Sequence, residues 1–436
     1  MQSTSVPPPP SAVGNYRWLV CALLFFATTV NYVDRQILSL IKPLLDVELG
    51  WTNKQFGLVN GVFQFAYGIS FLWFGGFIDR VGTKIGYAVS MTAWSIAAIG
   101  HSLVGSVNGF FVARVSLGIG EGGNFPSAIK AIALWFPQKD RALATTIFNS
   151  GPNIAAILSP LIVPWIAVTF GWRAAFIMAG LAGFVILFLW IPYYNVPEKI
   201  KRLSAGELAY IRSDAENQNG ETAKVSYWHL LRYRQTWSFI VAKFMTDPIW
   251  WFFLIWLPDY FNSSRHLNIT KSIPHLVAIY TIVTVVSNIG GWVTGRLAKT
   301  GWTVTKARKI SMVAAALCVV PVYFATQVGN WTAVLLIGLA AGAHQAWSGN
   351  LFTTVSDMFP KREIGSIVGL GGMAGAAVGV MFPIMSGWIL DYFTTRGDVT
   401  QGYHILFAIC AFAYLVAFAI HHLLAPRFEQ FEISKA

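Results

Sequence analysis

Long apolar runs separated by short polar connections repeat along most of the chain. Windows of about 19 apolar residues, the length that lets a helix cross a bilayer, recur twelve times. One long polar stretch, residues 195–236, separates six of these windows from the other six. The predicted spans are Trp18–Ile41, Gly57–Ile78, Ile85–Val104, Phe110–Leu134, Leu143–Thr169, Ala174–Tyr194, Trp237–Phe261, Ile273–Leu297, Ile310–Gln327, Trp331–Phe359, Ile364–Leu390 and His404–Leu424.

This pattern predicts an all-α integral membrane protein with two six-helix bundles. The predicted parts are a disordered cytoplasmic tail over 1–17, a first bundle over 18–194, a cytoplasmic central loop over 195–236, a second bundle over 237–425 and a cytoplasmic tail over 426–436. A single twelve-helix bundle without internal symmetry is the alternative. A weak repeat speaks against it, because Gly75–Arg80 at the end of the second span is similar to Gly291–Arg296 at the end of the eighth.

The composition agrees with a membrane protein. Hydrophobic residues make up 55% of the chain and charged residues 11%, whereas about 25% of a soluble domain is charged. The net charge is +12, but the basic residues gather in alternate loops without interleaved aromatic residues, which excludes a nucleic-acid-binding protein. With the N-terminus inside, 21 Lys and Arg residues fall on inner segments and six on outer loops. We therefore expect both termini in the cytoplasm and a multi-pass protein of the bacterial inner membrane.

The cysteines give no sign of a metal site or a disulfide framework. Cys21, Cys318 and Cys410 all lie inside apolar spans, without the spacing that either would require. No spacing of a nucleophile and a base appears either. The sequence therefore predicts a protein that is not an enzyme and that needs no metal or cofactor.

Four charged residues lie inside predicted spans of the first half. Arg114 and Glu121 are seven residues apart, so their side chains return to nearly the same helix face. Asp34 and Arg35 lie in the first span. Because an ionised group in lipid costs at least about 2 kcal/mol, we expect all four to face the protein interior. A static salt-bridge network is the alternative to a functional site, although buried ion pairs stabilise less than apolar packing does.

The loop after the second span carries the motif Gly75-x-x-x-Asp79-Arg80-x-Gly82-x-Lys84. Its glycines allow close helix packing and a turn, and Asp79 can dock on the N-terminus of a neighbouring helix as a breakable latch. An ordinary Asp–Arg pair in a loop is the alternative. The motif resembles the loop signature of the major facilitator superfamily, which implies two six-helix domains that rock around a site at the bilayer midplane. Gly295 stands where a second latch would need its acid, which speaks against a symmetrical pair.

Further motifs resemble one family within that superfamily, the anion:cation symporters, whose members move organic anions with protons. They are Asn31-Tyr32-Val33-Asp34-Arg35 and Arg114-x-x-x-Gly118-x-Gly120-Glu121-Gly122. The second half is similar to the bacterial hexuronate transporters of that family. The segments that carry this likeness are Lys243-Phe244-Met245-Thr246-Asp247-Pro248-Ile249-Trp250 and Ala343-His344-Gln345-Ala346-Trp347-Ser348-Gly349-Asn350.

The four buried charges predict a coupling mechanism. Without substrate, Arg35 is expected to pair with ionised Glu121 across a helix interface. The carboxylate of a sugar acid takes that place only when a proton neutralises Glu121, so anion entry and proton uptake are coupled. Asp34 and Arg114 are expected to form a second pair and a second proton site. The family resemblance implies similar roles for these four positions.

A sugar acid also needs partners for its hydroxyl groups. The candidates are Tyr32, Gln64, Tyr67, Asn149 and Asn153 in the first half, and His344, Gln345, Trp347, Ser348 and Asn350 in the tenth span. Structural hydrogen bonds between helices are the alternative for the amides, and a neutral buried imidazole is the alternative for His344. Lys243 and Asp247 have the spacing of an intrahelical ion pair beside Pro248, where a gate could bend; a purely structural pair is the alternative.

The sequence thus predicts a proton-coupled symporter that imports a hexuronate such as glucuronate or galacturonate by alternating access. Its expected partners are the anion, protons and the lipid bilayer, and it is expected to act as a monomer driven by the proton gradient. An aldonate, a glucarate-type diacid or another organic anion is the nearest alternative. A drug/proton antiporter and a non-transporting sensor are more distant ones.

Overall fold

A computed structural model describes residues 14–213 and 227–429, and every regular element in these two ranges is helical. The predicted tails lie largely outside the described residues, as does 214–226 of the predicted central loop. The first bundle contains α1 (Tyr16–Leu40), α2 (Lys42–Leu49), α3 (Asn53–Val81), α4 (Thr83–Gly100), η1 (His101–Leu103), α5 (Val107–Glu121), α6 (Asn124–Trp135), α7 (Gln138–Phe170) and α8 (Trp172–Tyr193).

The central loop contains short helices, and the second bundle again consists of long ones. In the loop lie η2 (Pro197–Lys199), α9 (Ala205–Ile211) and α10 (Tyr227–Leu230). The second bundle contains α11 (Arg234–Asp259), η4 (Tyr260–Ser264), α12 (Ile269–Lys299), α13 (Val304–Val319), η5 (Val320–Phe324), α14 (Asn330–Met358), α15 (Lys361–Thr394) and α16 (Val399–Leu424).

Nine helical segments in the described part of the chain are long and apolar enough to cross a membrane. They belong to α1, α3, α7, α8, α11 with η4, α12, α13 with η5, α15 and α16. The other three expected spans are helical as well, but the 18 residues of α4 include the polar Thr83 and Lys84 at its start, the fourth span is divided, and α14 carries the polar cluster of the tenth span. The structure therefore has the all-α architecture with two bundles that the sequence predicts.

The fourth predicted span is not one continuous helix, because α5 ends at Glu121 and α6 begins at Asn124. Gly122 between them passes so close to α3 that a Cβ there would lie 2.5 Å from the Oγ of Ser70. The φ and ψ angles of Gly122 are −59° and −21°, so the chain kinks without leaving the helical region. Both Arg114 and Glu121 belong to α5, so their predicted placement on one helix is confirmed.

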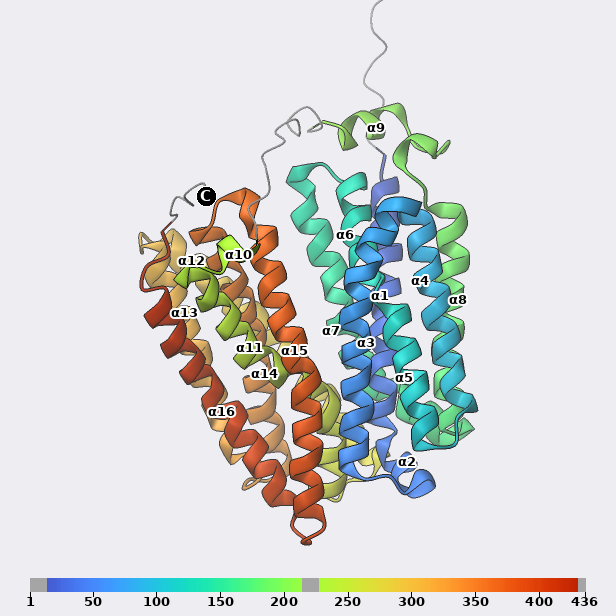
Figure 1. The fold of residues 1–436 in the computed structure, drawn as a ribbon, viewed down its shortest axis with the longest axis vertical. Helices are drawn as coiled ribbons and strands as arrows, with labels where there is room; N and C mark the ends of the chain where they lie inside the picture. Colours follow the sequence, from blue (N-terminus) through green and yellow to red (C-terminus); the bar gives the residue numbers. More distant parts are fainter. Residues whose placement is uncertain (1–13, 214–226, 430–436) are drawn as a thin grey trace, which may run out of the picture.

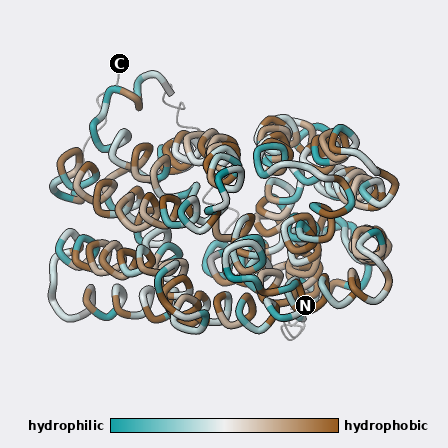
Figure 2. Tube along the Cα trace, turned by 90° about the horizontal axis from the view of Figure 1, so that it is seen from below, coloured by the Kyte–Doolittle hydropathy of each residue, from teal (hydrophilic) through white to brown (hydrophobic). Residues whose placement is uncertain are grey.

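Both ends of the described chain lie at the same end of the molecule, at the top of Figure 1. The distribution of basic residues along the sequence predicts that this end faces the cytoplasm, so we call it the cytoplasmic end and the opposite one the outer end. Helix α9 lies over the first bundle at the cytoplasmic end (Figure 1). Figure 2 views the molecule along the helices and shows the two bundles side by side.

Side-chain caps begin several helices at the outer end. In α3, the hydroxyl of Thr52 accepts a hydrogen bond from the backbone N–H of Gln55, and the side-chain Oε1 of Gln55 accepts one from the backbone N–H of Thr52. The Oδ1 of Asn268 and the Oδ1 of Asp398 accept equivalent bonds at the starts of α12 and α16, at 2.8 and 3.1 Å. Such caps satisfy backbone N–H groups that have no partner inside the helix, so the sequence defines these starts locally.

The two bundles touch each other at the outer end. A Cβ on Gly57 of α3 would lie 2.5 Å from the carbonyl oxygen of Pro383 and 3.3 Å from the Cα of Gly387, both on α15. Among the described residues, nothing lies within 4 Å of a Cβ built on Gly75 of α3 or on Gly369 of α15, nearer the cytoplasmic end. The same two helices are therefore in contact at their outer ends and part toward the cytoplasm.

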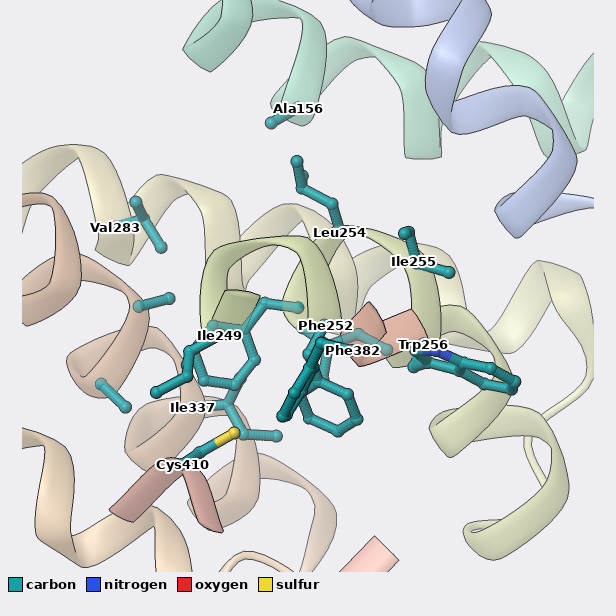
Figure 3. Packing of buried hydrophobic residues seen from close by; sticks show 14 of the residues in the cluster. Ala156, Ile249, Phe252, Leu254, Ile255, Trp256, Val283, Ile337, Phe382 and Cys410 are labelled. Atoms are coloured by element: carbon teal, nitrogen blue, oxygen red, sulfur yellow. The ribbon is translucent and has the colours of Figure 1, made fainter. Parts of the chain in front are cut away.

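Helix α11 connects the cores of the two bundles. Ile249 and Phe252 pack with Phe382 and other apolar residues of the second bundle, while Leu254 points toward Ala156 of α7 in the first (Figure 3). All of these side chains belong to one buried cluster. This apolar contact closes the space between the bundles on the side of the outer end.

Candidate substrate and proton site

A buried ion pair joins α1 to α5 inside the first bundle. The Nε of Arg35 donates to the Oε2 of Glu121 at 2.6 Å, and the two side chains are 6% and 0% exposed. The predicted contact between these residues, which are 86 positions apart, is confirmed. Their roles in binding and coupling stay predictions.

Aromatic rings surround the guanidinium group of Arg35. Its Cζ lies 4.3 Å from the ring centre of Tyr67, 4.6 Å from that of Tyr32 and 5.5 Å from that of Phe63, which are cation–π contacts. Neither terminal nitrogen of Arg35 makes a hydrogen bond of normal geometry with any residue that the structure describes. Glu121 therefore occupies only the Nε, and the two terminal nitrogens retain their capacity to bind a second anion.

The predicted pair between Asp34 and Arg114 is not formed in this conformation. The Nη2 of Arg114 instead donates to the backbone carbonyl oxygen of Arg35 at 3.4 Å. Both carboxyl oxygens of Asp34 are buried without a hydrogen-bond partner within 14–213 and 227–429. Asp34 lies near enough to α5 for Glu121 and Arg114 to act on it electrostatically, but the guanidinium of Arg114 is turned to the carbonyl oxygen of Arg35 and not to the carboxyl group of Asp34.

A cavity of about 20 Å³ lies beside Arg35, which is room for about one water molecule. The first bundle contributes Tyr32, Arg35, Gln36, Ser39, Asn60, Phe63, Gln64 and Arg114 to its lining, and α11 contributes Trp251, Leu254 and Ile255. The cavity therefore lies between the bundles. The structure brings four predicted residues together there, namely Tyr32, Arg35, Gln64 and Arg114.

Several lining residues were missed from the sequence. Gln36 lies four residues after Tyr32, and Asn60 lies four residues before Gln64, so each shares a helix face with a residue that was predicted. That spacing could have identified both. Trp251 offered no such signal, because its approach to the cavity depends on how the two bundles pack.

The polar residues predicted on α14 are engaged within the second bundle. The Nδ1 of His344 hydrogen-bonds with the hydroxyl group of Tyr414, and Trp347 is fully buried edge-on against the same tyrosine. The amide nitrogen of Asn350 donates to a threonine hydroxyl of α12 at 3.2 Å. None of these three residues is part of the cavity lining described above. A substrate contact by any of them stays a prediction that this conformation does not support.

Four other predicted residues also lie away from the cavity lining in the described structure. Asn153 on α7 and Gln345 and Ser348 on α14 are half-buried, and Asn149 is exposed. Tyr67 is not part of the lining either, but it stacks on Arg35 and so helps to position that side chain. Substrate contact by these residues remains a prediction.

The predicted intrahelical pair between Lys243 and Asp247 is confirmed, with an Nζ to Oδ2 distance of 2.6 Å. The Nζ of Lys243 also lies 4.5 Å from the ring centre of Phe352. Both partners of the lysine belong to the second bundle. The structural interpretation of this pair is therefore favoured over a gate that touches substrate.

The glycine-rich motif connects α3 to α6 at the cytoplasmic end of the first bundle. Asp79 forms an ion pair with Lys130 of α6 at 2.6 Å, and Lys130 also donates to the backbone carbonyl oxygen of Ile78. Gly82 has a φ of +83° between α3 and α4, a conformation that glycine adopts at no steric cost. The remaining motif residues, Gly75, Arg80 and Lys84, are half-buried or exposed at this end. The action of the motif as a latch stays a prediction.

An ion pair that was not predicted joins the bundles at the outer end. The Nζ of Lys42 lies 2.7 Å from the Oδ1 of Asp259 on α11 and 2.8 Å from the Oδ2 of Asp46 on α2. The hydroxyl of Tyr403 donates to the other oxygen of Asp259. Burial raises the pKa of the Asp46 carboxyl, an effect that the charge of Lys42 opposes. Because the side chains of Lys42 and Asp259 are only 3% and 2% exposed, this network seals the outer end of the interface.

The chain matches the model of the Major Facilitator Superfamily over residues 24–383. Together with two helix bundles around a central charged cavity, this match shows that the chain belongs to the major facilitator superfamily of multi-pass membrane transporters. It is 30% identical to the hexuronate transporter of Escherichia coli strain K12, over 91% of this chain and 90% of that relative. It is 28% identical to a probable galactarate/D-glucarate transporter of Bacillus subtilis strain 168, over 86% of each protein.

A solved structure shares the fold at low sequence identity. It is a bacterial homologue of the human lysosomal transporter Spinster in an inward-facing, occupied conformation, with a TM-score of 0.75 at 15% identity. The match covers 95% of this chain and 97% of that one. The family match and the 30% identical relative show that the chain is a membrane transporter and not an enzyme, and this likeness agrees with its fold.

Proposed function

We propose that this protein is a proton-coupled symporter of the bacterial inner membrane that imports a sugar-acid anion, with a hexuronate as its substrate. One observation carries this proposal: the guanidinium of Arg35 lies at the wall of the central cavity, and neither terminal nitrogen makes a hydrogen bond of normal geometry with the described residues. A carboxylate matches these two nitrogens with two parallel hydrogen bonds. The rings of Tyr32 and Tyr67 hold the guanidinium plane and limit its rotation.

The rest of the cavity lining suits a sugar ring. Gln36, Ser39, Asn60 and Gln64 supply amide and hydroxyl groups that can bond to sugar hydroxyls. Trp251 supplies an aromatic face from the opposite bundle. A site that combines one guanidinium group for a carboxylate, several amide groups and an aromatic wall favours a polyhydroxylated monocarboxylate over an apolar acid.

The balance of buried charge favours a monoanion. A buried ionised carboxylate without a donor is costly, so we infer that Asp34 is neutral in this conformation. The guanidinium groups of Arg35 and Arg114 then face only the negative charge of Glu121, which leaves one positive charge in excess. This excess attracts an anion, and binding a hexuronate together with a proton on Glu121 leaves the charge of the site unchanged.

Proton coupling follows from the shared use of Arg35. Protonation of Glu121 removes the anion that occupies the Nε of Arg35, and so strengthens the attraction of Arg35 for a substrate carboxylate. By linkage, a bound substrate favours the protonated form of Glu121 to the same degree. Anion and proton therefore enter together and leave together.

The described conformation has to widen before it can hold a substrate. A cavity of about 20 Å³ has room for about one water molecule and not for a sugar. The bundles part toward the cytoplasm, while Lys42 and Asp259 hold them together at the outer end. We infer that loading from outside requires this outer contact to open as the bundles rock.

Arg114 favours a second candidate substrate, a diacid of the glucarate type. Arg114 lines the same cavity as Arg35, and no acid among the described residues lies within ion-pair distance of it. With Glu121 and Asp34 both neutral, two guanidinium groups could bind two carboxylates. The similarity to the probable galactarate/D-glucarate transporter of Bacillus subtilis supports this candidate. Two buried arginines disfavour a cationic drug as the cargo.

Uptake into proteoliposomes tests the proposal. We expect labelled glucuronate or galacturonate to accumulate under an inward proton gradient and only to equilibrate without it. Accumulation of glucarate without that of either hexuronate would select the second candidate. Export of a cationic dye would contradict the proposed function. So would hexuronate accumulation that does not depend on the proton gradient.

A further inference from the structure

A second cavity, of about 320 Å³, lies at the cytoplasmic end of the first bundle. It forms where α1 and α4 begin, where α8 ends and where the central loop starts. Its lining includes Tyr16, Lys84, Tyr193, Lys199, Lys201 and Arg202. None of these residues lines the central cavity, so the two sites are separate.

The charge of this second cavity is unbalanced. Its lining contains four cations, Lys84, Lys199, Lys201 and Arg202, and no acid. Within the described ranges none of the four forms an ion pair. Other cations of the same region are neutralised, since Arg17 pairs with Glu207 at 3.1 Å and Arg212 with Glu198 at 2.5 Å. The hydrogen bond from Arg212 also lowers the pKa of the Glu198 carboxyl, as expected when a carboxylate is the partner of a cation. Within 14–213 and 227–429, the four lining cations are thus left without an anionic partner and can attract a bound anion.

An apolar surface adjoins this basic cavity on the membrane side. Pro192 and Tyr193 line the cavity at the cytoplasmic end of α8. Just before them on the same helix, the side chains of Phe188 and Ile191 are exposed by 69% and 47%. Exposed apolar residues on a spanning helix face lipid tails, so the basic cavity lies at the level of the lipid headgroups.

We propose that this cavity, which we call the basic interfacial pocket, binds the phosphate headgroup of an anionic phospholipid from the cytoplasmic leaflet. The phosphodiester is held by Lys199, Lys201 and Arg202 from the loop and by Lys84 from α4, while the acyl chains follow the apolar face of α8. A free phosphate carries the same charge but makes no use of that apolar face. The bound lipid ties the start of the central loop to the membrane surface.

Lipid binding to the purified full-length protein tests the proposal. Native mass spectrometry would measure the affinities for phosphatidylglycerol, phosphatidylcholine and inorganic phosphate. We expect phosphatidylglycerol to bind selectively, and the double variant Lys199→Gln/Arg202→Gln to bind it about 30-fold more weakly, since each basic residue contributes about fivefold. The matched control, Arg212→Gln, removes a cation that is already paired with Glu198 and should keep the wild-type affinity.

Three results would overturn the proposal. They are equal affinity of the double variant and the wild type for phosphatidylglycerol, equal binding of phosphatidylcholine, and binding of inorganic phosphate as tight as that of the lipid. If the double variant does not fold, the charge-conserving variant Lys199→Arg/Arg202→Lys replaces it. That variant should bind phosphatidylglycerol with an affinity within about threefold of the wild type, because it keeps the positive charge of the pocket that attracts the lipid phosphate. Loss of binding in this variant would contradict the assignment.

Discussion

The two bundles accommodate buried charge in opposite ways. In the first, each of Asp34, Arg35, Arg114 and Glu121 keeps at least one buried polar atom without a hydrogen-bond partner among the described residues. In the second, Lys243 pairs with Asp247 one turn further along the same helix, and His344 bonds to Tyr414. The Lys243–Asp247 pair and His344 of the second bundle thus have their partners within that bundle, while the four charges of the first bundle are only partly satisfied.

This difference indicates where solute and proton are exchanged. A buried polar group without a partner costs free energy, and it persists where function requires the group to receive a partner later. We therefore propose that the first bundle supplies the charges that bind the anion and the proton. The second bundle closes the cavity with Trp251, Leu254 and Ile255, none of which is ionisable.

The largest effect is expected from Arg35→Lys. Lysine retains the positive charge but not the planar pair of terminal nitrogens that a carboxylate matches. We expect the kcat/KM for hexuronate uptake to fall about 100-fold, the equivalent of one charge-assisted bidentate contact. The control is Arg173→Lys, because Arg173 is exposed and paired with Glu48 on the outer surface, and its uptake should stay within about twofold of wild type. Retained uptake in Arg35→Lys would show that the two terminal nitrogens of Arg35 do not bind the substrate carboxylate.

The next largest effect concerns the contact that holds the bundles together. Asp259→Asn leaves the buried Lys42 with only Asp46, which is less buried, as its anionic partner. Because breaking a buried pair costs about 3 kcal/mol or more, we expect the population with an open outer end to rise at least tenfold. Distances between spin labels at Val47 and Arg396 would report it. The exposed Glu48→Gln is the control, and an unchanged distance distribution in Asp259→Asn would show that this pair does not close the outer end.

A matched pair of substitutions compares the two bundles directly. Asp34→Asn replaces a carboxyl group that has no described partner by its neutral isostere, so we expect the Tm to change by less than about 2 °C. Asp247→Asn leaves Lys243 buried without its anion, so we expect the Tm to fall by about 5 °C. Thermal unfolding in the same detergent measures both. Equal losses would mean that Asp34 is ionised and paired, which would contradict the contrast between the bundles.

The smallest effect on transport is expected from His344→Gln. His344 is buried against Trp250 and bonded to Tyr414, and it does not line the cavity that the structure describes. We expect the KM for hexuronate to stay within about twofold and the pH profile of uptake to be unchanged, with a modest loss of stability. A KM raised tenfold would place His344 in the substrate site in another conformation.

Contacts that depend on one helix, or on the cost of charge in lipid, could be predicted from the sequence. The spacing of Lys243 and Asp247 identified their ion pair. The cost of placing Arg35 and Glu121 in lipid predicted that both face inward, and their opposite charges predicted that they meet. These predictions needed no knowledge of how the bundles are tilted.

Contacts between bundles could not be predicted in this way. Lys42 and Asp259 are 217 residues apart, and they meet only because the outer ends of the two bundles approach each other. The absence of the Asp34–Arg114 pair and the kink at Gly122 both depend on how α5 is rotated and how closely it packs on α3. Helix tilt and rotation are set by packing against neighbouring helices, which no local pattern records.

Glu121→Gln tests the central claim most directly, because glutamine mimics the protonated glutamate and cannot release a proton. In proteoliposomes, we predict that exchange of labelled hexuronate across the membrane stays within about threefold of wild type, because Arg35 remains free to bind the carboxylate. Accumulation under an inward proton gradient should fall to the level reached without a gradient. Gradient-driven accumulation at the wild-type level would contradict the account, because the proton would then be carried without Glu121.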